Sequence, residues 1–391
     1  MKPVLFVTGH APPDRVGAFA ALHERERIEV ALFGGRSKHG GDRSEIEEIS
    51  GTQHGGLGRP AGELPFPHRF IAQHEPARLA ASGDYRAVVC STGGRVALPT
   101  TWAGARRGRV PLILWTSLWA HPRSAAHLFS YLALLRLYRS ADAVVTYGPH
   151  VSAYVRTHGA RNVHVAVQAV DNAFWRAPVA TAPSDPAWPR EADVKFMFAG
   201  RLAREKGLGA LMEAWRKSDL QAPSAALVLV GSGSSPPWVP AGGAVGCAGV
   251  AGDWAGVGGV SSIRSVPPER LREMYADADV LVVPSIRTRT FREPWGLVVN
   301  EAMNRGLPII ASDEVGAAAG GLVHNGHNGL VVPADDSDAL ADAMVRLARD
   351  PELRTRLGEA AARDVRAYTY DAWADGFSQA LATVGLARTH C

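Results

Sequence analysis

Short apolar runs separated by helix-length segments are the feature of this chain that most restricts its fold. In the first half they include PVLFVTG (3–9), IEVALFG (28–34) and PLILWT (111–116), and similar runs span 86–93, 141–148 and 163–171. Runs that are apolar on both faces are typical of strands in a parallel sheet with helices on each side. The pattern therefore predicts a doubly wound α/β domain.

The same alternation begins again after a segment rich in Pro and Ala, RAPVATAPSDPAWPREAD (176–193). The later runs span 194–200, 226–233, 279–285, 308–312 and 329–333. Because one core rarely serves 391 residues, we expect two domains of similar size. Their predicted bounds are 1–175 and 194–372, joined by a linker at 176–193. Residues 373–391 are expected to form a C-terminal helix that could cross back to the first domain.

Two further stretches of the second half have a distinct character. Residues 233–262 are rich in Gly, Ala and Pro, which predicts a surface excursion without regular structure over much of its length. After Asp335 the pattern predicts two or three helices, with Asp336 or Ser337 as an N-cap and Pro351 at a helix start.

Composition and cysteine usage narrow the class of protein. The chain is 46% hydrophobic and 20% charged, as in ordinary globular proteins. Its longest apolar runs fall short of the roughly 18 residues that cross a bilayer, and the N-terminus is interpreted as a first strand and not as a leader. Cys90, Cys247 and Cys391 lack metal or redox spacing, which favours a reducing cytoplasm.

A net charge of +4 is compatible with an anionic substrate, a phosphorylated cofactor or an acidic membrane surface. The sequence lacks a clustered basic helix with aromatic platforms, so we do not expect a nucleic-acid partner. Residues 123–143 are expected to be helical and to pack on the first sheet. The alternative is a weak peripheral contact with the inner face of the cell membrane. No pattern indicates an oligomeric state.

The segment FREPWGLVVNEAMNRGLPIIAS (291–312) predicts a helix from about Trp295 that ends at Gly306. Gly296 allows backbone amides to approach a ligand, and the free amides of a first helical turn attract anions. Glu293 precedes this turn and Glu301 follows inside the helix. Since carboxylates bind paired hydroxyls, the arrangement suits a ligand with sugars flanking a phosphate group. The alternative is a capping acid at Glu293 and a solvated charge at Glu301.

A second candidate element is the strand-to-helix loop GRLAREKG (200–207). Arg201 and Lys206 in this loop can neutralise a diphosphate, the first with a planar fork and the second as a mobile charge. The alternative for each is a solvated loop cation. Together with the two glutamates in the same half, they predict a nucleotide-sugar site.

These motifs resemble retaining glycosyltransferases of the GT-B fold, in particular the GT4 family, also described as glycosyl transferases group 1. The resemblance rests on 200–207, LVGSG (229–233), 267–285, 293–312 and NGHNGLVVPADD (325–336). In the first half it is looser and rests on 141–155 and 168–175. It implies two Rossmann-like domains that face each other across a cleft, with the nucleotide sugar in the second and the acceptor in the first.

The resemblance also implies roles for residues at the donor. Arg201, Lys206 and the amides of Gly296 and Leu297 would hold the diphosphate, and Glu293, Trp295 and Gly296 would contact the sugar. Glu301 would bind the ribose, and Gly231 and Gly233 would lie near the base. A UDP-sugar is favoured over a GDP-sugar as co-substrate, and neither a metal nor another cofactor is required.

For catalysis the resemblance implies a same-face displacement with Glu293 and a histidine near the sugar. His121 is the candidate, and His10 and His127 are less well placed. The acceptor would be a hydroxyl of a glycan, a glycolipid precursor or a small metabolite. Alternatives are an epimerase or a phosphorylase of the same fold, or a non-catalytic protein that binds nucleotide sugars.

The chain departs from the family pattern in three places. The first loop has only Gly17 where an acceptor or phosphate loop usually carries a glycine pair. VGAAAGGLV (315–323) lacks the usual loop glutamate. IRTRTFR (286–292) is longer than expected and adds Arg287, Arg289 and Arg292 before Glu293. These differences bear on the acceptor more than on the donor.

Overall fold

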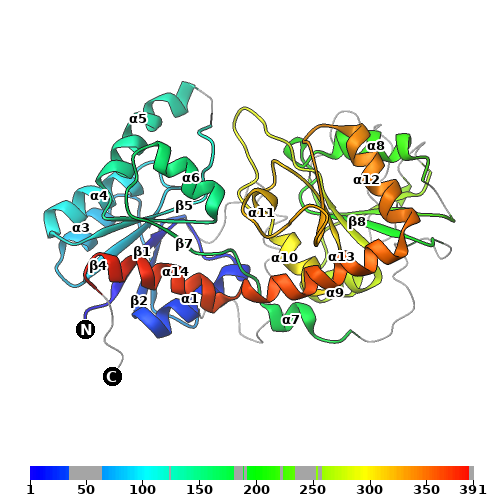
Figure 1. Ribbon diagram of the computed structural model, residues 1–391. Helices are drawn as coiled ribbons and strands as arrows, with labels where there is room; N and C mark the ends of the chain where they lie inside the picture. The colour runs from blue at the N-terminus through cyan, green and yellow to red at the C-terminus, as the bar shows by residue number, and fades with distance from the viewer. Residues whose placement is uncertain are drawn as a thin grey trace. The chain divides into compact units, whose positions relative to one another are not determined.

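The computed structural model describes residues 1–34, 64–122, 125–179, 188, 192–220, 223–233, 252–253 and 258–386, with the side chains of 125–129 left out. The chain forms two compact units (Figure 1). The first contains Met1–Asp171 and Tyr368–Cys391, and the second contains Asn172–Ala367. Most of the predicted linker, 176–193, lies outside the described residues.

The first unit is built on a parallel sheet with strand order β3-β2-β1-β4-β5-β6-β7. Its strands are β1 (Val4–Thr8), β2 (Ile28–Leu32), β3 (His68–Phe70), β4 (Ala87–Ser91), β5 (Leu112–Thr116), β6 (Ala143–Thr146) and β7 (Val163–Val165). The chain winds outward from β1 in one direction and then returns to β4 on its other side. This reversal of strand order defines the switch point of a doubly wound sheet.

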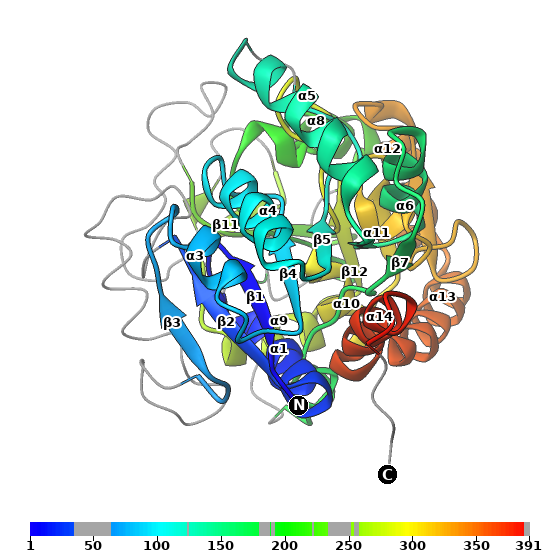
Figure 2. The same ribbon diagram turned by 90° about the vertical axis from the view of Figure 1, so that its left-hand side faces the viewer.

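Helices cover both faces of this sheet because successive strand residues point to opposite sides. Val4 and Phe6 of β1 pack with α1 (Pro13–Glu26) and α14 (Tyr370–Thr383). Leu5 and Val7 pack in a separate cluster on the other face of the sheet. The helices of the layer on that face are labelled in Figure 2. That layer consists of α3 (Pro76–Ala81), α4 (Ala97–Gly108), α5 (Ala125–Ser140) and α6 (Pro149–Thr157).

The second unit repeats the design with strand order β10-β11-β9-β8-β12-β13-β14. Its strands are β8 (Lys195–Ala199), β9 (Ala226–Val230), β10 (Gly252–Asp253), β11 (Val260–Ile263), β12 (Val280–Val283), β13 (Ile309–Ser312) and β14 (Gly329–Val332). Only β10 among these described strands is antiparallel to its neighbour. The switch point lies between β8 and β12.

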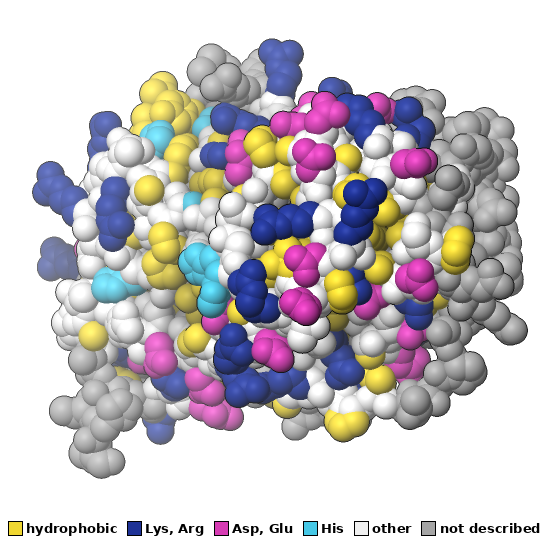
Figure 3. Space-filling view, turned by 45° about the vertical axis from the view of Figure 1, so that its right-hand side comes forward, with side chains coloured by type: hydrophobic (Ala, Val, Ile, Leu, Met, Phe, Trp, Pro, Cys, Tyr) yellow, Lys and Arg dark blue, Asp and Glu magenta, His cyan; other side chains and the backbone are white. Residues whose placement is uncertain are grey.

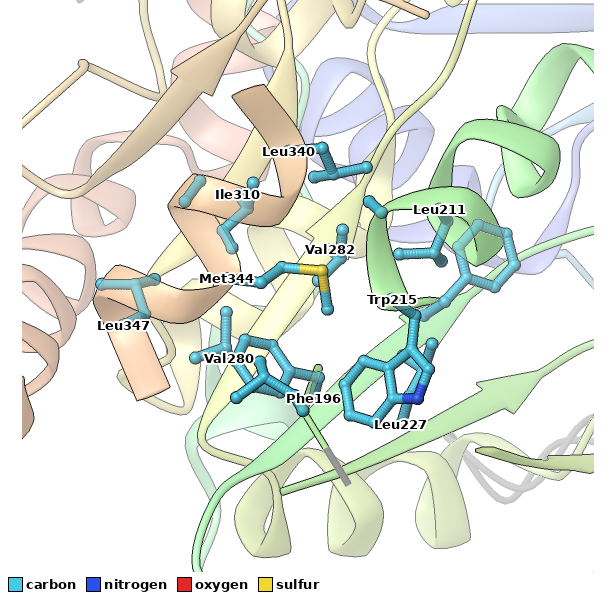
Figure 4. Packing of buried hydrophobic residues seen from close by; sticks show 14 of the residues in the cluster. Phe196, Leu211, Trp215, Leu227, Val280, Val282, Ile310, Leu340, Met344 and Leu347 are labelled. Atoms are coloured by element: carbon cyan, nitrogen blue, oxygen red, sulfur yellow. The ribbon is translucent and has the colours of Figure 1, made fainter. Parts of the chain in front are cut away.

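One face of the second sheet is covered by α8 (Leu208–Ser218) and α12 (Ser337–Arg349). Trp215 of α8 and Met344 of α12 are buried against Phe196, Val280 and Val282 of the strands (Figure 4). The remaining helices of the unit are α7 (Asn172–Arg176), η1 (Arg204–Lys206), α9 (Pro268–Asp277), α10 (Leu297–Asn304), α11 (Gly316–Ala319), α13 (Pro351–Asp364) and η2 (Val365–Ala367).

The α/β architecture predicted from sequence is confirmed, and so are two helix starts. Asp336 caps α12 by accepting hydrogen bonds from the amides of Asp338 and Ala339, at 3.1 and 2.9 Å. Pro351 occupies the first turn of α13. No helix in the described part of the chain is long and apolar enough to cross a membrane.

Three local predictions differ from the structure. Within 233–262, residues 234–251 and 254–257 lie outside the description, but Val260–Ile263 is the buried strand β11. The helix expected from Trp295 begins at Leu297, because Gly296 adopts a left-handed backbone, φ +91°, that no helix continues. Strand β3 was not predicted, since its His and Arg lack an apolar pattern.

Candidate active site

The loops after β8 and β12 lie on either side of the switch point in the second unit, where doubly wound sheets bind ligands. Backbone contacts hold these loops together. The amide of Ile286 donates to the carbonyl of Glu205 at 2.9 Å. Gly207 has a φ of +71°, and a Cβ there would lie 1.8 Å from the carbonyl oxygen of Pro284. Only glycine fits this crossing.

The loop after β9 joins the same edge through two glycines. A Cβ on Gly231 would lie 1.8 Å from the Gly200 oxygen, and one on Gly233 would lie 2.6 Å from the Leu202 oxygen. The Leu202 amide also donates to Ser232 O at 3.0 Å. Both glycines therefore have a packing reason to be present. Their predicted place near a nucleotide base stays a prediction.

The central contact of the site is an ion pair between Lys206 and Glu293. Glu293 is buried, with 6% of its surface exposed, and its Oε2 atom also accepts a hydrogen bond from Ser285 Oγ at 3.1 Å. The Lys206 ammonium lies 5.8 Å from the centre of the Phe291 ring. A buried carboxylate requires such partners, since an unpaired charge is costly in a protein interior. The structure thus joins two residues that the sequence placed in one site.

Arg201, the second predicted diphosphate ligand, is held differently. Its side chain is 59% exposed and pairs with Glu205 at 2.9 Å, one helical turn along the same loop. It therefore lies on the surface of the loop that also carries Lys206. The guanidinium is thus accessible to an incoming anion, whereas the Lys206 ammonium already contacts a carboxylate.

The Pro-Trp-Gly turn, residues 294–296, is held by hydrogen bonds from the first residues of α11. The amide of Gly316 donates to Glu293 O at 3.2 Å, and that of Ala317 donates to Trp295 O at 2.8 Å. The Trp295 indole is only 2% exposed and donates to Asn300 Oδ1 at 2.8 Å. Its side chain therefore anchors the turn inside the protein. A ligand could meet only the backbone here, including the amides at the start of α10.

Glu301 lies half-buried on α10 and accepts a hydrogen bond from the Tyr275 hydroxyl of α9 at 3.0 Å. Tyr275 is fully buried, with the Trp175 ring 5.7 Å from its own. Burial, followed by the charge of Glu301, raises the pKa of Tyr275 well above its usual value. The phenol therefore remains a donor and holds the carboxylate. Sequence reasoning missed Tyr275, whose only signal is a tyrosine on the apolar side of a helix.

The predicted residues of the first unit have other surroundings. His121 lies half-buried after β5, with its ring 4.7 Å from that of Tyr131, whose hydroxyl lies 3.1 Å from His158 Nε2. A catalytic role for His121 stays a prediction. Gly17 lies inside α1 and not in a loop, and a Cβ there would lie 2.2 Å from the Tyr370 ring. Because α1 begins at Pro13, Gly17 is a helical residue, and its contact with Tyr370 explains the need for a small residue here.

Comparison with known proteins finds a family model that matches the segment containing this site. Residues 193–350, less than half of the chain, match the family model described as glycosyl transferases group 1. The matching segment contains the loops after β8, β9 and β12 and both candidate glutamates. This segment is therefore similar to the group 1 glycosyltransferases, which agrees with the resemblance of the motifs.

Two curated relatives carry the same name, D-inositol 3-phosphate glycosyltransferase. The one from Corynebacterium glutamicum is 40% identical over 111 residues, which are 28% of this chain and 24% of that protein. The one from Streptomyces bingchenggensis is 37% identical over 134 residues, 32% of this chain and 27% of that protein. The alignments thus span about a quarter of each relative.

Solved structures match the chain over nearly its full length. The Anabaena protein HepE in complex with UDP and glucose has a TM-score of 0.68 at 17% identity and covers 98% of this chain and 100% of its own. Sucrose-phosphate synthase from Thermosynechococcus elongatus has a TM-score of 0.68 at 19% identity. The match covers 98% of this chain and 99% of that protein. The fold is therefore that of the GT-B glycosyltransferases, with two Rossmann-like domains.

Proposed function

We propose that the chain is a retaining glycosyltransferase that moves a hexose-type sugar from a nucleoside-diphosphate sugar, UDP-linked by preference, to a hydroxyl acceptor. The observation that carries the proposal is the Lys206–Glu293 pair at the switch point, inside the group 1 segment. The pair joins a cation in the loop after β8 to a carboxylate in the loop after β12. The backbones of these two loops are in direct contact. HepE, solved with UDP and glucose, shares the fold and supports the choice of donor.

Each residue of the site has a chemical part in this proposal. Lys206, Arg201 and the first amides of α10 would meet the negative charges of the diphosphate. Glu293, which precedes the first turn of α10, would accept hydrogen bonds from hydroxyls of the transferred sugar. Glu301, held by Tyr275, would accept the ribose hydroxyls, because a fixed carboxylate loses little freedom on binding.

Catalysis in this scheme consists of positioning the acceptor and stabilising the departing diphosphate. Lys206 and the α10 amides would stabilise the charge that develops when the sugar–phosphate bond breaks. We therefore propose that transfer needs no metal, and that a chelator such as EDTA leaves the initial rate unchanged.

The acceptor is proposed as a glycan, a glycolipid precursor or a small metabolite. The curated relatives are named for D-inositol 3-phosphate, so phosphorylated polyols are the first compounds to offer. The test incubates the chain with UDP-glucose and an acceptor panel, follows UDP release, and determines the anomeric configuration of the product by NMR. Retained configuration and loss of transfer in Glu293→Gln are the expected results.

The same assay separates the alternatives. An epimerase would change the sugar with donor alone, and a phosphorylase would require inorganic phosphate. A non-catalytic binding protein would bind UDP-glucose in calorimetry without turnover across the panel.

Within the cell we propose a cytoplasmic enzyme that can also contact an anionic membrane weakly. Leu132 on α5 is 69% exposed, and Arg136 and Arg139 on the same helix are exposed too. Such a helix can rest on acidic headgroups. Sedimentation with phosphatidylglycerol vesicles tests this contact, and Leu132→Ser with Arg136→Ala should lower the bound fraction.

A further inference from the structure

The segment between β12 and Glu293 contains two exposed arginines, Arg287 and Arg289. It begins at the switch point, where Ser285 and Ile286 contact Glu293 and the β8 loop. It ends at Arg292, directly before the buried carboxylate of Glu293. Both arginines therefore lie within a few residues of the proposed sugar contact.

This segment is a defined turn. The Thr288 amide donates to Phe291 O at 2.9 Å, and the Phe291 amide donates to Thr288 Oγ1 at 3.0 Å. Phe291 packs against Lys206, and Arg292 forms an ion pair with Glu314. Thr288, Phe291 and Arg292 thus attach the turn to the protein. The turn presents Arg287 and Arg289 outward from a fixed backbone.

The charges around the site are unevenly matched. Lys206 pairs with Glu293, Arg201 with Glu205 and Arg292 with Glu314. For Arg287 and Arg289 the described residues provide no ion-pair partner. On the face of the molecule drawn in Figure 3, basic and acidic side chains are interspersed. Two positive charges therefore remain at the sugar end of the site.

We propose that Arg287 and Arg289 bind an acidic substituent, a carboxylate or a phosphate, on the transferred sugar or on the acceptor, and so determine specificity. This inference rests on the proposed function. The proposed ligands of the diphosphate are different groups: Lys206 and Arg201 in the loop after β8, and the amides of α10, which follow Glu293 in the sequence. The planar guanidinium fork matches carboxylate and phosphate groups. A solvated turn without a ligand would show no preference for acidic substrates.

The test compares Arg287→Ala/Arg289→Ala with wild type and with a matched control, Arg346→Ala/Arg349→Ala. The control arginines are exposed in the last turn of α12, which runs from the carboxyl edge of the sheet toward its other edge. A third variant, Arg287→Lys/Arg289→Lys, keeps the charge and removes the forks.

Calorimetry first measures the binding of UDP. It then compares UDP-glucose with UDP-glucuronate as a neutral and an acidic donor. With UDP present, it compares inositol with D-inositol 3-phosphate as a neutral and an acidic acceptor. We expect the acidic member of one pair to bind wild type at least tenfold more tightly than its neutral partner. The alanine variant should lose this preference, the lysine variant should keep part of it, and UDP affinity should stay within twofold. The pair that responds identifies whether sugar or acceptor carries the acid.

Three results would overturn the proposal. Wild type could show no preference for the acidic member of either pair, the preference could survive in the alanine variant, or UDP affinity itself could fall tenfold in that variant. The last result would assign the arginines to the diphosphate. Failure of the proposed function is separate, since either UDP would bind neither wild type nor any variant, or UDP-glucose would bind without turnover in the transfer assay.

Discussion

Lys206 and Glu293 lie 87 positions apart and form the ion pair on which the site depends. Their side chains are 18% and 8% exposed, so removal of one leaves the other charged in a poorly solvated place. We expect Lys206→Met to lower the free energy of unfolding of the second unit by roughly 2–4 kcal/mol. The double variant Lys206→Met/Glu293→Gln should recover most of the lost free energy of unfolding, because it leaves no unpaired charge. Urea unfolding measures both variants, and equal midpoints for the single variant and wild type would contradict the account.

Gly207 and Gly209 offer a matched pair at the start of α8. An alanine at position 207 meets a positive φ and the Pro284 carbonyl, whereas nothing lies within 4 Å of a Cβ at position 209. Gly207→Ala should cost at least about 2 kcal/mol, and Gly209→Ala should be neutral or stabilise by up to about 1 kcal/mol. Thermal melts of the two proteins provide the comparison. Similar melting temperatures would show that the loops do not touch as described.

Tyr275 allows a test of the ribose contact that does not require turnover. Tyr275→Phe removes the hydroxyl that holds Glu301, so UDP affinity should fall by about three- to tenfold. The affinity for 2′-deoxy-UDP should change much less, because that ligand lacks one of the two hydroxyls. Calorimetry with both nucleotides decides the matter. An equal loss for both would assign Tyr275 a merely structural role.

At the scale of elements, α1 and α14 come from opposite ends of the chain and pack together in the first unit. Gly17 is where the Tyr370 ring meets α1, so Gly17→Ala should destabilise this unit by about 1–3 kcal/mol. In the Tyr370→Ala background the same change should cost much less. Denaturant unfolding of the four proteins tests the coupling, and additive effects would refute the contact.

The sequence predicted the elements that have strong apolar periodicity. Strands β1, β5, β8 and β12 lie within the predicted runs, because buried parallel strands are apolar on both faces. Strand β11 was missed because its two serines interrupt the apolar pattern. Gly17 was assigned to a loop because the family resemblance expects a glycine pair in the first loop, whereas Pro13 already starts the helix here.

The candidate site was predictable as a set of residues but not as a set of contacts. Strand-loop-helix motifs mark Lys206 and Glu293 in sequence, yet their pairing depends on which strands become neighbours. Trp295 was expected to contact the sugar. In the structure its side chain is buried, and its indole donates a hydrogen bond to Asn300, five residues later. Tyr275 lies in the segment 267–285 that carries the resemblance, but it received no role, since its contact with Glu301 depends on how α9 and α10 pack.

For the molecule as a whole, the two sheets wind in the same order apart from the antiparallel edge strand β10, while the family match covers only residues 193–350 of the second unit. Donor chemistry can therefore be argued from shared motifs. The place of the acceptor in the first unit stays a prediction, because the family match does not reach that unit.

The most direct test of the nucleotide-sugar site is calorimetric titration of UDP and UDP-glucose into wild type and Glu293→Gln. The account predicts that both ligands bind wild type, that UDP still binds the variant, and that the variant loses the added affinity for the sugar. Absence of UDP binding to wild type, or unchanged UDP-glucose affinity in the variant, would contradict it.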